Sequence, residues 1–299
     1  MKTSTLIFAL ALLSTAAAAQ TRLNYGTLRW SDDGRKLLFS CIEVNANWSN
    51  YSPYNWKLYV YDLKRKDLEL VDRAAQYGAF SPDGEKVVYS KNSGFSWDIF
   101  ILDLASGSKQ KVTDTPQDET APDWSPDGRM IAFTMKLKKG VSSIYSMDTQ
   151  GGNVRNLSRN GDFECLNPEF SPDGERLAYY MDRGDKKDQV YVMEIYSGFA
   201  RNVTRDNNHN IFPGWFDNQS LIYTRANEEV CIKEIDGSAP VPVDGIQSYL
   251  AKYNARQSQI AYINREDQSI YVRKLKGRPG RLKLGKAGRV VSPEVVKGE

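Results

Sequence analysis

A four-residue string, Ser-Pro-Asp-Gly, occurs three times in the chain, and its regular spacing constrains the fold more than any other feature. The copies are residues 81–84, 125–128 and 171–174, and a close variant, Ser-Asp-Asp-Gly, occupies residues 31–34. The glycines of the four copies are separated by 50, 44 and 46 residues. Self-similarity at a period of roughly 20–50 residues is the signature of a fold assembled from repeated units.

An apolar, partly aromatic stretch follows each copy, and two further stretches of this kind occur without the motif. Such stretches are typical of buried β-strands, and the six are residues 37–40, 87–90, 131–134, 177–180, 221–224 and 260–263. Two more strand-like segments follow this stretch in every unit, and an aromatic strand precedes most of the turns. The sequence therefore predicts six units of four strands each.

Six such units without helical periodicity predict an all-β fold, a six-bladed β-propeller with four-stranded blades. One four-stranded sheet cannot bury both of its faces, whereas sheets stacked around a ring cover one another. The Asp-Gly step supplies the positive φ that a tight turn between strands requires. The way the ring closes stays open: residues 281–284 are a candidate outer strand, and residues 290–295 are a candidate partner for residues 21–24.

The repeat resembles the WD40-like repeat, also called PD40, of TolB-type propellers. The best copy is residues 113–128, TDTPQDETAPDWSPDG, and the resemblance extends over about residues 28–284. It implies the fold rather than a function, because the motif residues form turns and packing. TolB carries an additional α/β domain before its propeller, whereas here the first predicted blade begins almost directly after the predicted signal peptide. We therefore expect the propeller only, without that domain and without a role in the Tol-Pal system. No GxSxG string occurs, so a serine peptidase of the kind that shares this repeat is not expected.

The first 19 residues are predicted to be a secretory signal peptide. Lys2 is followed by an apolar run at residues 6–13 and by small residues up to Ala19, after which cleavage is expected. The apolar run is far shorter than the roughly 20 residues that span a bilayer, so membrane insertion is not expected. Residues 20–299 should then form a single propeller domain that is periplasmic or secreted and monomeric.

Charge and cysteine content exclude several classes of function. The 40 basic and 37 acidic residues give no nucleic-acid signature. The three cysteines, Cys41, Cys165 and Cys231, are odd in number, so at least one thiol stays free. His209 is the only histidine, which leaves too few ligands for a zinc site.

Connections in a four-stranded blade alternate between the two faces of the ring. We call the face that carries the Asp-Gly turns the turn face, and the opposite one, which carries the longer connections such as residues 41–56, the long-loop face. This loop interleaves four amide residues with four aromatic residues, which are Trp48, Tyr51, Tyr54 and Trp56. Exposed aromatic rings among amides suit the binding of sugar rings or a partner peptide. Alternatively, the rings pack on a neighbouring blade.

Polar residues of the inter-blade connections are predicted on the same face, where they could surround the channel mouth. The candidates are Asp118, Glu119, Glu164, His209 and Asn210. Converging carboxylates and amides could bind Ca²⁺. The alternative is that they are ordinary solvated residues at strand ends, and we expect no resident cofactor.

Two functions remain open on these residues. The favoured hypothesis is a non-enzymatic interaction module that binds an envelope or extracellular protein, peptide or glycan through its long-loop face. The alternative is a small metal-assisted uronate lyase in which His209 is the catalytic base. The lyase needs His209 and a divalent ion in one concave pocket, whereas a binding module needs only a broad aromatic and polar rim.

Overall fold

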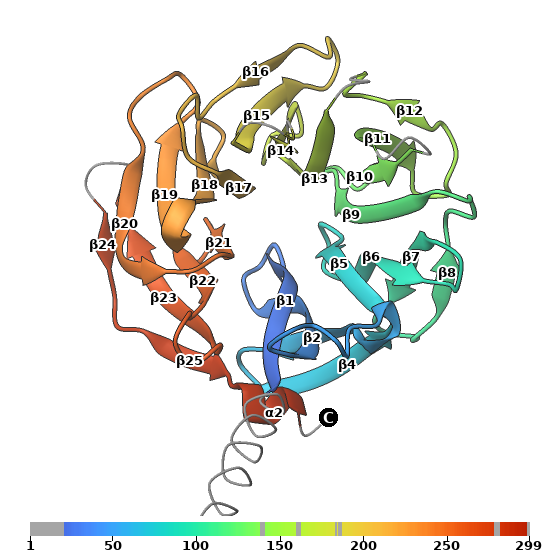
Figure 1. Cartoon of the computed structure of the whole chain (residues 1–299), viewed down its shortest axis with the longest axis horizontal. Coiled ribbons are helices and arrows are strands. Elements are labelled where there is room, and N and C mark those ends of the chain that lie inside the picture. Colours follow the sequence, from blue (N-terminus) through green and yellow to red (C-terminus); the bar gives the residue numbers. More distant parts are fainter. Residues whose placement is uncertain are drawn as a thin grey trace, which may run out of the picture.

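The structure is a computed structural model that describes residues 21–137, 141–159, 163–182, 184, 187–277 and 282–297. Six antiparallel sheets stand around a central axis, as the repeat predicted (Figure 1). The predicted signal peptide lies outside the described residues. Among the residues described, no helix has the length and apolar character needed to cross a membrane.

The first three blades are each one continuous segment of chain, with strands ordered from the axis outward (Figure 1). Blade 1 consists of β1 (Thr21–Trp30), β2 (Lys36–Asn45), β3 (Lys57–Asp62) and β4 (Asp67–Arg73). Blade 2 consists of β5 (Ala75–Phe80), β6 (Lys86–Asn92), β7 (Trp97–Asp103) and β8 (Lys109–Lys111). Blade 3 consists of β9 (Asp118–Trp124), β10 (Met130–Lys136), β11 (Ser142–Asp148) and β12 (Arg155–Asn156).

Blades 4 and 5 follow the same plan, and blade 6 has a fifth strand. Blade 4 consists of β13 (Glu164–Phe170), β14 (Arg176–Asp182), β15 (Gln189–Glu194) and β16 (Ala200–Asn202). Blade 5 consists of β17 (Asn210–Asp217), β18 (Ser220–Arg225), β19 (Glu229–Glu234) and β20 (Val241–Gln247). Blade 6 consists of β21 (Ala251–Asn254), β22 (Gln259–Ile263), β23 (Ile270–Lys276), β24 (Lys283–Leu284) and β25 (Gly288–Val291). The short helices are η1 (Pro53–Asn55), η2 (Ala226–Glu228) and α2 (Pro293–Lys297).

The Ser-Pro-Asp-Gly motif forms the same turn wherever it occurs. In blade 2 the Gly84 amide donates to the Ser81 carbonyl at 2.8 Å, and Ser81 Oγ donates to Asp83 Oδ1. The Lys86 amide then donates to Ser81 Oγ at 2.9 Å, which starts the next strand. Gly84 has a φ of 73°, a conformation that costs glycine little but strains other residues. Each motif therefore fixes both the turn and the register of the strands beside it.

The apolar core consists of clusters between the facing sheets of neighbouring blades and of side chains that pack against one another on the same sheet. An aromatic residue of the second strand stacks on its cross-strand partner in the third strand in several blades, for example Phe39 on Tyr59 and Tyr179 on Tyr191, with ring centroids 5.5 and 5.8 Å apart. Such cross-strand pairs stabilise a sheet and fix its register. The three cysteines are all free thiols buried in this core, which agrees with the expectation that at least one thiol is free.

Ring closure differs from the candidate pairing of residues 290–295 with residues 21–24. β1 begins at Thr21 and pairs with β2, whereas β25 pairs with β23 and completes the outer edge of blade 6. No strand of the described residues is shared between blades 1 and 6. Side chains join the two blades instead: the Leu23 amide donates to Gln268 Oε1 at 3.0 Å, and Tyr25 Oη donates to the Gln268 carbonyl at 2.7 Å. Val296 of α2 packs into the apolar cluster that these blades share.

Candidate functional site

The aromatic loop of blade 1 is shorter than the sequence indicated, because β2 continues to Asn45. The strand extends this far because Ile42 and Val44 are buried in a cluster with Trp56. Trp56 is only 7% exposed and also packs against Trp97 of blade 2. Trp56 therefore anchors the base of the loop, as the packing alternative proposed, and is not part of an exposed surface.

The amide side chains of this loop hold its conformation. The Asn45 amide donates to Asn50 Oδ1 at 2.8 Å, and Asn45 Nδ2 donates to Ser49 Oγ at 2.7 Å. Asn55 Nδ2 donates to the Asn50 carbonyl at 3.3 Å, and Ser52 caps η1. The amides are thus used inside the loop, which fixes the positions of the rings between them.

The other three predicted rings project from this braced loop. Trp48, Tyr51 and Tyr54 are 41%, 48% and 56% exposed, and the rings of Trp48 and Tyr51 lie 6.0 Å apart between centroids. Tyr54 also lines a surface groove of about 430 Å³ together with Asn50 and Asn55. Side chains of this size are seldom left in water as a group unless a partner covers them.

A fourth exposed ring on this face was not predicted. Phe95 is completely exposed at the tip of the connection between β6 and β7. This connection occupies the same position in blade 2 as the aromatic loop in blade 1, and Trp97, two residues later, contacts Trp56. A phenylalanine flanked by Ser93, Gly94 and Ser96 was a usable signal, since these residues give it nothing local to pack against.

The predicted carboxylates do not converge on one site. Glu119 is fully buried, with both oxygens accepting hydrogen bonds from the Thr113 and Thr115 hydroxyls, and burial raises its pKa. Asp118 Oδ1 accepts from the Trp97 amide at 3.0 Å and so ties blade 3 to blade 2. Glu164 pairs with Asp182 in the register of blade 4. Within the described residues, no group of three or more His, Cys, Asp or Glu side chains is placed to hold a metal ion.

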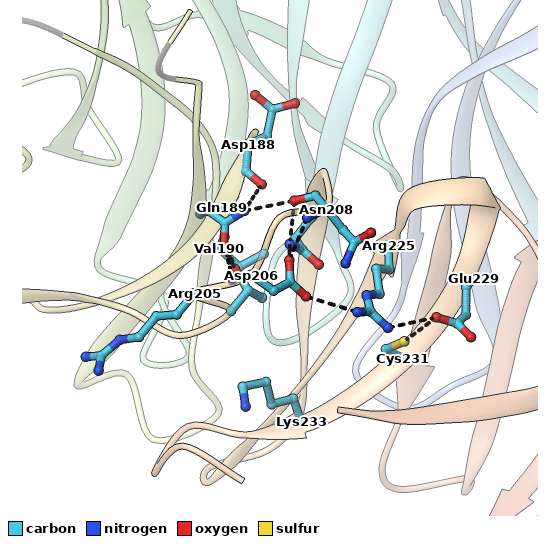
Figure 2. A network of polar contacts seen from close by, with 12 residues as sticks. Asp188, Gln189, Val190, Arg205, Asp206, Asn208, Arg225, Glu229, Cys231 and Lys233 are labelled. Carbon is cyan, nitrogen blue, oxygen red and sulfur yellow. Dashed lines mark hydrogen bonds and ion pairs between the residues drawn. The ribbon is translucent and has the colours of Figure 1, made fainter. Parts of the chain in front are cut away.

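His209 and Asn210 belong to a polar network between blades 4 and 5. Asn210 is fully buried, and its Nδ2 donates to Asp206 Oδ1 at 2.8 Å. Asp206 also faces the Arg225 guanidinium at 3.3 Å, and Arg225 contacts Glu229 in turn (Figure 2). These contacts hold the inter-blade connection against β18 and β19.

Both ring nitrogens of His209 have partners. Nδ1 lies 2.8 Å from Asp188 Oδ2, and Nε2 lies 3.1 Å from Lys187 Nζ. Because an ammonium can only donate, Nε2 accepts from Lys187, and this pairing assigns the Nδ1–H tautomer. The nitrogen that would have to remove a proton in a lyase is therefore already occupied.

A backbone irregularity recurs at the channel wall in four of the innermost strands. Tyr77, Ala121, Asn167 and Phe212 have φ values of 45–55°, each where the strand slips register against its neighbour. Such bulges re-aim side chains, and these four residues line a passage of about 20 Å³ on the axis. This volume holds about one water molecule, so the passage does not admit a larger solute.

A family model described as the TolB beta propeller domain, PD40, matches residues 19–165. The solved structure of TolB from Acinetobacter baumannii matches with a TM-score of 0.63 at 17% identity, and the match covers 93% of this chain and 84% of that one. The chain is a TolB-like β-propeller. At this identity, the structural likeness of the TolB-like propeller to the Acinetobacter protein concerns the fold alone.

Curated relatives match the TolB-like propeller over shorter segments. The Tol-Pal system protein TolB of Francisella tularensis subsp. mediasiatica is 33% identical over 103 residues, which are 33% of this chain and 21% of the relative. The uncharacterized peptidase YuxL of Bacillus subtilis is 31% identical over 85 residues, which are 26% of this chain and 13% of the relative. The chain thus spans at most about a fifth of these relatives, in its propeller repeats.

Proposed function

We propose that the chain is an exported interaction module that binds its partner through the long-loop face. The observation that carries this proposal is the braced aromatic loop, in which amide side chains fix the backbone while Trp48, Tyr51 and Tyr54 stay exposed. Large rings on a pre-ordered loop bind with little loss of conformational entropy, and such residues dominate binding hot spots.

A protein or peptide partner is favoured over a glycan. Sugar recognition requires hydrogen-bonding groups beside the stacking rings, and Asn45, Asn50 and Asn55 already bond within the loop. The exposed rings also extend from blade 1 to Phe95 of blade 2, a broad rim rather than a single sugar-sized pocket. The relatives named TolB of the Tol-Pal system and the predicted signal peptide support a periplasmic location.

The uronate lyase alternative has no support. His209 Nε2 is engaged by Lys187, and the acidic candidates lie apart from it in separate blades. A proton-abstracting base must reach the substrate proton directly or through one water. None of the relatives and structures named above is described as a lyase.

The test is a binding comparison with matched variants. The partner is captured by pull-down from an envelope extract with the mature chain. We expect Trp48→Ala together with Tyr51→Ala to weaken binding of this partner at least tenfold, about 1.4 kcal/mol, with almost no change in Tm. The control is Tyr196→Ala with Phe199→Ala, which removes two exposed rings, 91% and 66% exposed, from a turn on the opposite face. Equal loss of binding in both variants, or in neither, would refute the proposed face.

A further inference from the structure

The turn face has a deep hollow on the axis, opposite the aromatic loop. It is a funnel of about 510 Å³, a size usual for sites that bind small molecules. An aromatic residue stands at the turn end of every innermost strand, and all six line the funnel: Trp30, Phe80, Trp124, Phe170, Trp215 and Tyr253. Figure 1 shows these strands, β1, β5, β9, β13, β17 and β21, around the centre of the ring.

The residues one position earlier bring four charges to the bottom of this funnel. In blade order they are Arg29, Ala79, Asp123, Glu169, Gly214 and Lys252. Lys252 Nζ lies 2.6 Å from Glu169 Oε2 and donates to the Pro213 carbonyl at 2.5 Å, and Arg29 also pairs with Glu169 Oε2. Gly214 leaves the room for this group, since a Cβ there would lie 2.9 Å from Lys252 Nζ.

Asp123 is the charge at the bottom of the funnel that forms no salt bridge within the described residues, although Arg29 and Lys252 attract it from further away. It is 8% exposed, and among the residues described no Lys or Arg nitrogen lies within 4.0 Å of its carboxylate. Its Oδ2 accepts a hydrogen bond from the Phe170 amide of blade 4 at 2.8 Å. A neutral asparagine could accept the same bond, so the link between blades does not require the charge. Burial raises the pKa of Asp123, and the attraction of Arg29 and Lys252 offsets this only in part.

Arg29 is the second group with unused capacity. A guanidinium carries five donors, and its only ion pair in the described chain is with Glu169. Arg29 and Asp123 both line the funnel, and within the described residues they attract each other without a salt bridge of 4.0 Å or less between them. The narrow passage of about 20 Å³ behind Arg29 and Lys252 closes the funnel at its base.

We propose that this funnel binds a small zwitterion of the amino-acid or dipeptide class. Its ammonium group would pair with Asp123 and its carboxylate with Arg29, so the ligand bridges two opposite charges that face one pocket without meeting. The aromatic wall would take the apolar side chain. The two positive and two negative charges at the bottom of the funnel cancel, which favours a ligand of zero net charge over an anion or a cation.

Four probes of one shape test the pairing of charges. They are the zwitterion alanyl-phenylalanine, its N-acetyl form, its C-terminal amide, and the form blocked at both ends, measured by calorimetry with the mature chain. We expect the zwitterion to bind with a Kd below about 1 mM, and each single block to weaken binding at least tenfold. Equal binding of all four probes, or no binding of the zwitterion up to about 10 mM, overturns the proposal.

Variants assign each end of the ligand. Asp123→Asn keeps the hydrogen bond to the Phe170 amide. We expect this variant to bind the zwitterion and the C-terminal amide at least tenfold more weakly and to bind the N-acetyl probe with unchanged affinity. Arg29→Gln should instead weaken the binding of the zwitterion and of the N-acetyl probe. Asp118→Asn on the opposite face is the matched control, and it should leave the binding of all these probes unchanged. If Asp123→Asn binds all probes like the unaltered protein, the assignment is wrong.

The two faces are tested separately by one further measurement. Trp48→Ala with Tyr51→Ala should bind the zwitterion unchanged, because the aromatic loop and the funnel lie on opposite faces. A stable Asp123→Asn protein that loses the zwitterion but keeps its macromolecular partner separates this site from the proposed function. Loss of dipeptide binding in the loop variant would contradict two independent sites.

Discussion

Three tryptophans at equivalent positions differ in one hydrogen bond, and this difference can be measured. Trp215 Nε1 donates to the Glu169 carbonyl of blade 4 at 3.0 Å, and Trp30 Nε1 donates to the Lys252 carbonyl of blade 6 at 2.9 Å. Trp124 Nε1 is buried and has no partner among the described residues. Trp→Phe at each site removes similar apolar volume, but only the first two variants break a bond between blades.

The bond accounts for the expected difference in stability. A net hydrogen bond contributes about 1 kcal/mol, and an acceptor left buried and unpaired costs about 1–3 kcal/mol. Trp215→Phe and Trp30→Phe should therefore be less stable than Trp124→Phe by at least about 1 kcal/mol, or roughly 2–4 °C in Tm for a domain of this size. Trp215→Phe should lose more stability than Trp30→Phe, because the Arg176 guanidinium lies 5.3 Å from the centre of the Trp215 ring and interacts more strongly with an indole than with a phenyl ring.

The assay is urea and thermal unfolding followed by circular dichroism, because fluorescence changes when a tryptophan is removed. The slope of the urea transition should be the same in all three variants, which would show that the folded and unfolded states compared are alike. If Trp124→Phe is as destabilised as the other two, the inter-blade indole hydrogen bonds do not contribute to stability.

Two further predictions follow from buried titratable groups. Because burial raises the pKa of Asp123 in the folded protein, its carboxylate lowers stability above that pKa. Asp123→Asn should therefore raise Tm at pH 7, and the gain should shrink as pH falls and disappear below about 3.9, where the carboxyl group is protonated in both states; a lower Tm at pH 7 would contradict this. Burial raises the pKa of the Cys41 and Cys231 thiols to about 12, so neither should react with iodoacetamide at pH 8 until urea unfolds the chain, as mass spectrometry of the alkylated protein would show.

The fold was predictable because its signals are local and repeated. Each Asp-Gly turn fixes a register, and six apolar stretches at similar spacings of 39–50 residues identify six sheets without any knowledge of long-range contacts. Ring closure was not predictable in this way. β25 adds to β23, and residues 290–295 carry no pattern that distinguishes this neighbour from β1.

The site was predictable only in part, because burial is a property of the neighbours. Trp48 and Trp56 lie in the same aromatic run, yet only Trp56 meets Ile42, Val44 and Trp97. Glu119 has two threonine hydroxyls beside it and Asn210 has Asp206, so both are buried where an isolated polar residue would be exposed.

The floor of the funnel was missed for a different reason. Its charges occupy one position of the repeat but are four different residues, so no motif identifies them until the innermost strands are aligned on their turns. Such an alignment puts all four charges at one position of the repeat, with Ala79 between Arg29 and Asp123 and Gly214 between Glu169 and Lys252. Whether those charges meet depends on the diameter of the ring.

Each blade is one unbroken stretch of chain, and this allows the order of the blades to be changed without dividing a sheet. Joining the present ends and opening the chain between β4 and β5, or at any other blade boundary, would leave every ladder of backbone hydrogen bonds intact. A propeller whose first and last blades exchange a strand does not have this freedom. Here the number of blades can also change by gain or loss of a whole unit at the seam, with only side-chain contacts such as those of Tyr25 and Gln268 to be replaced.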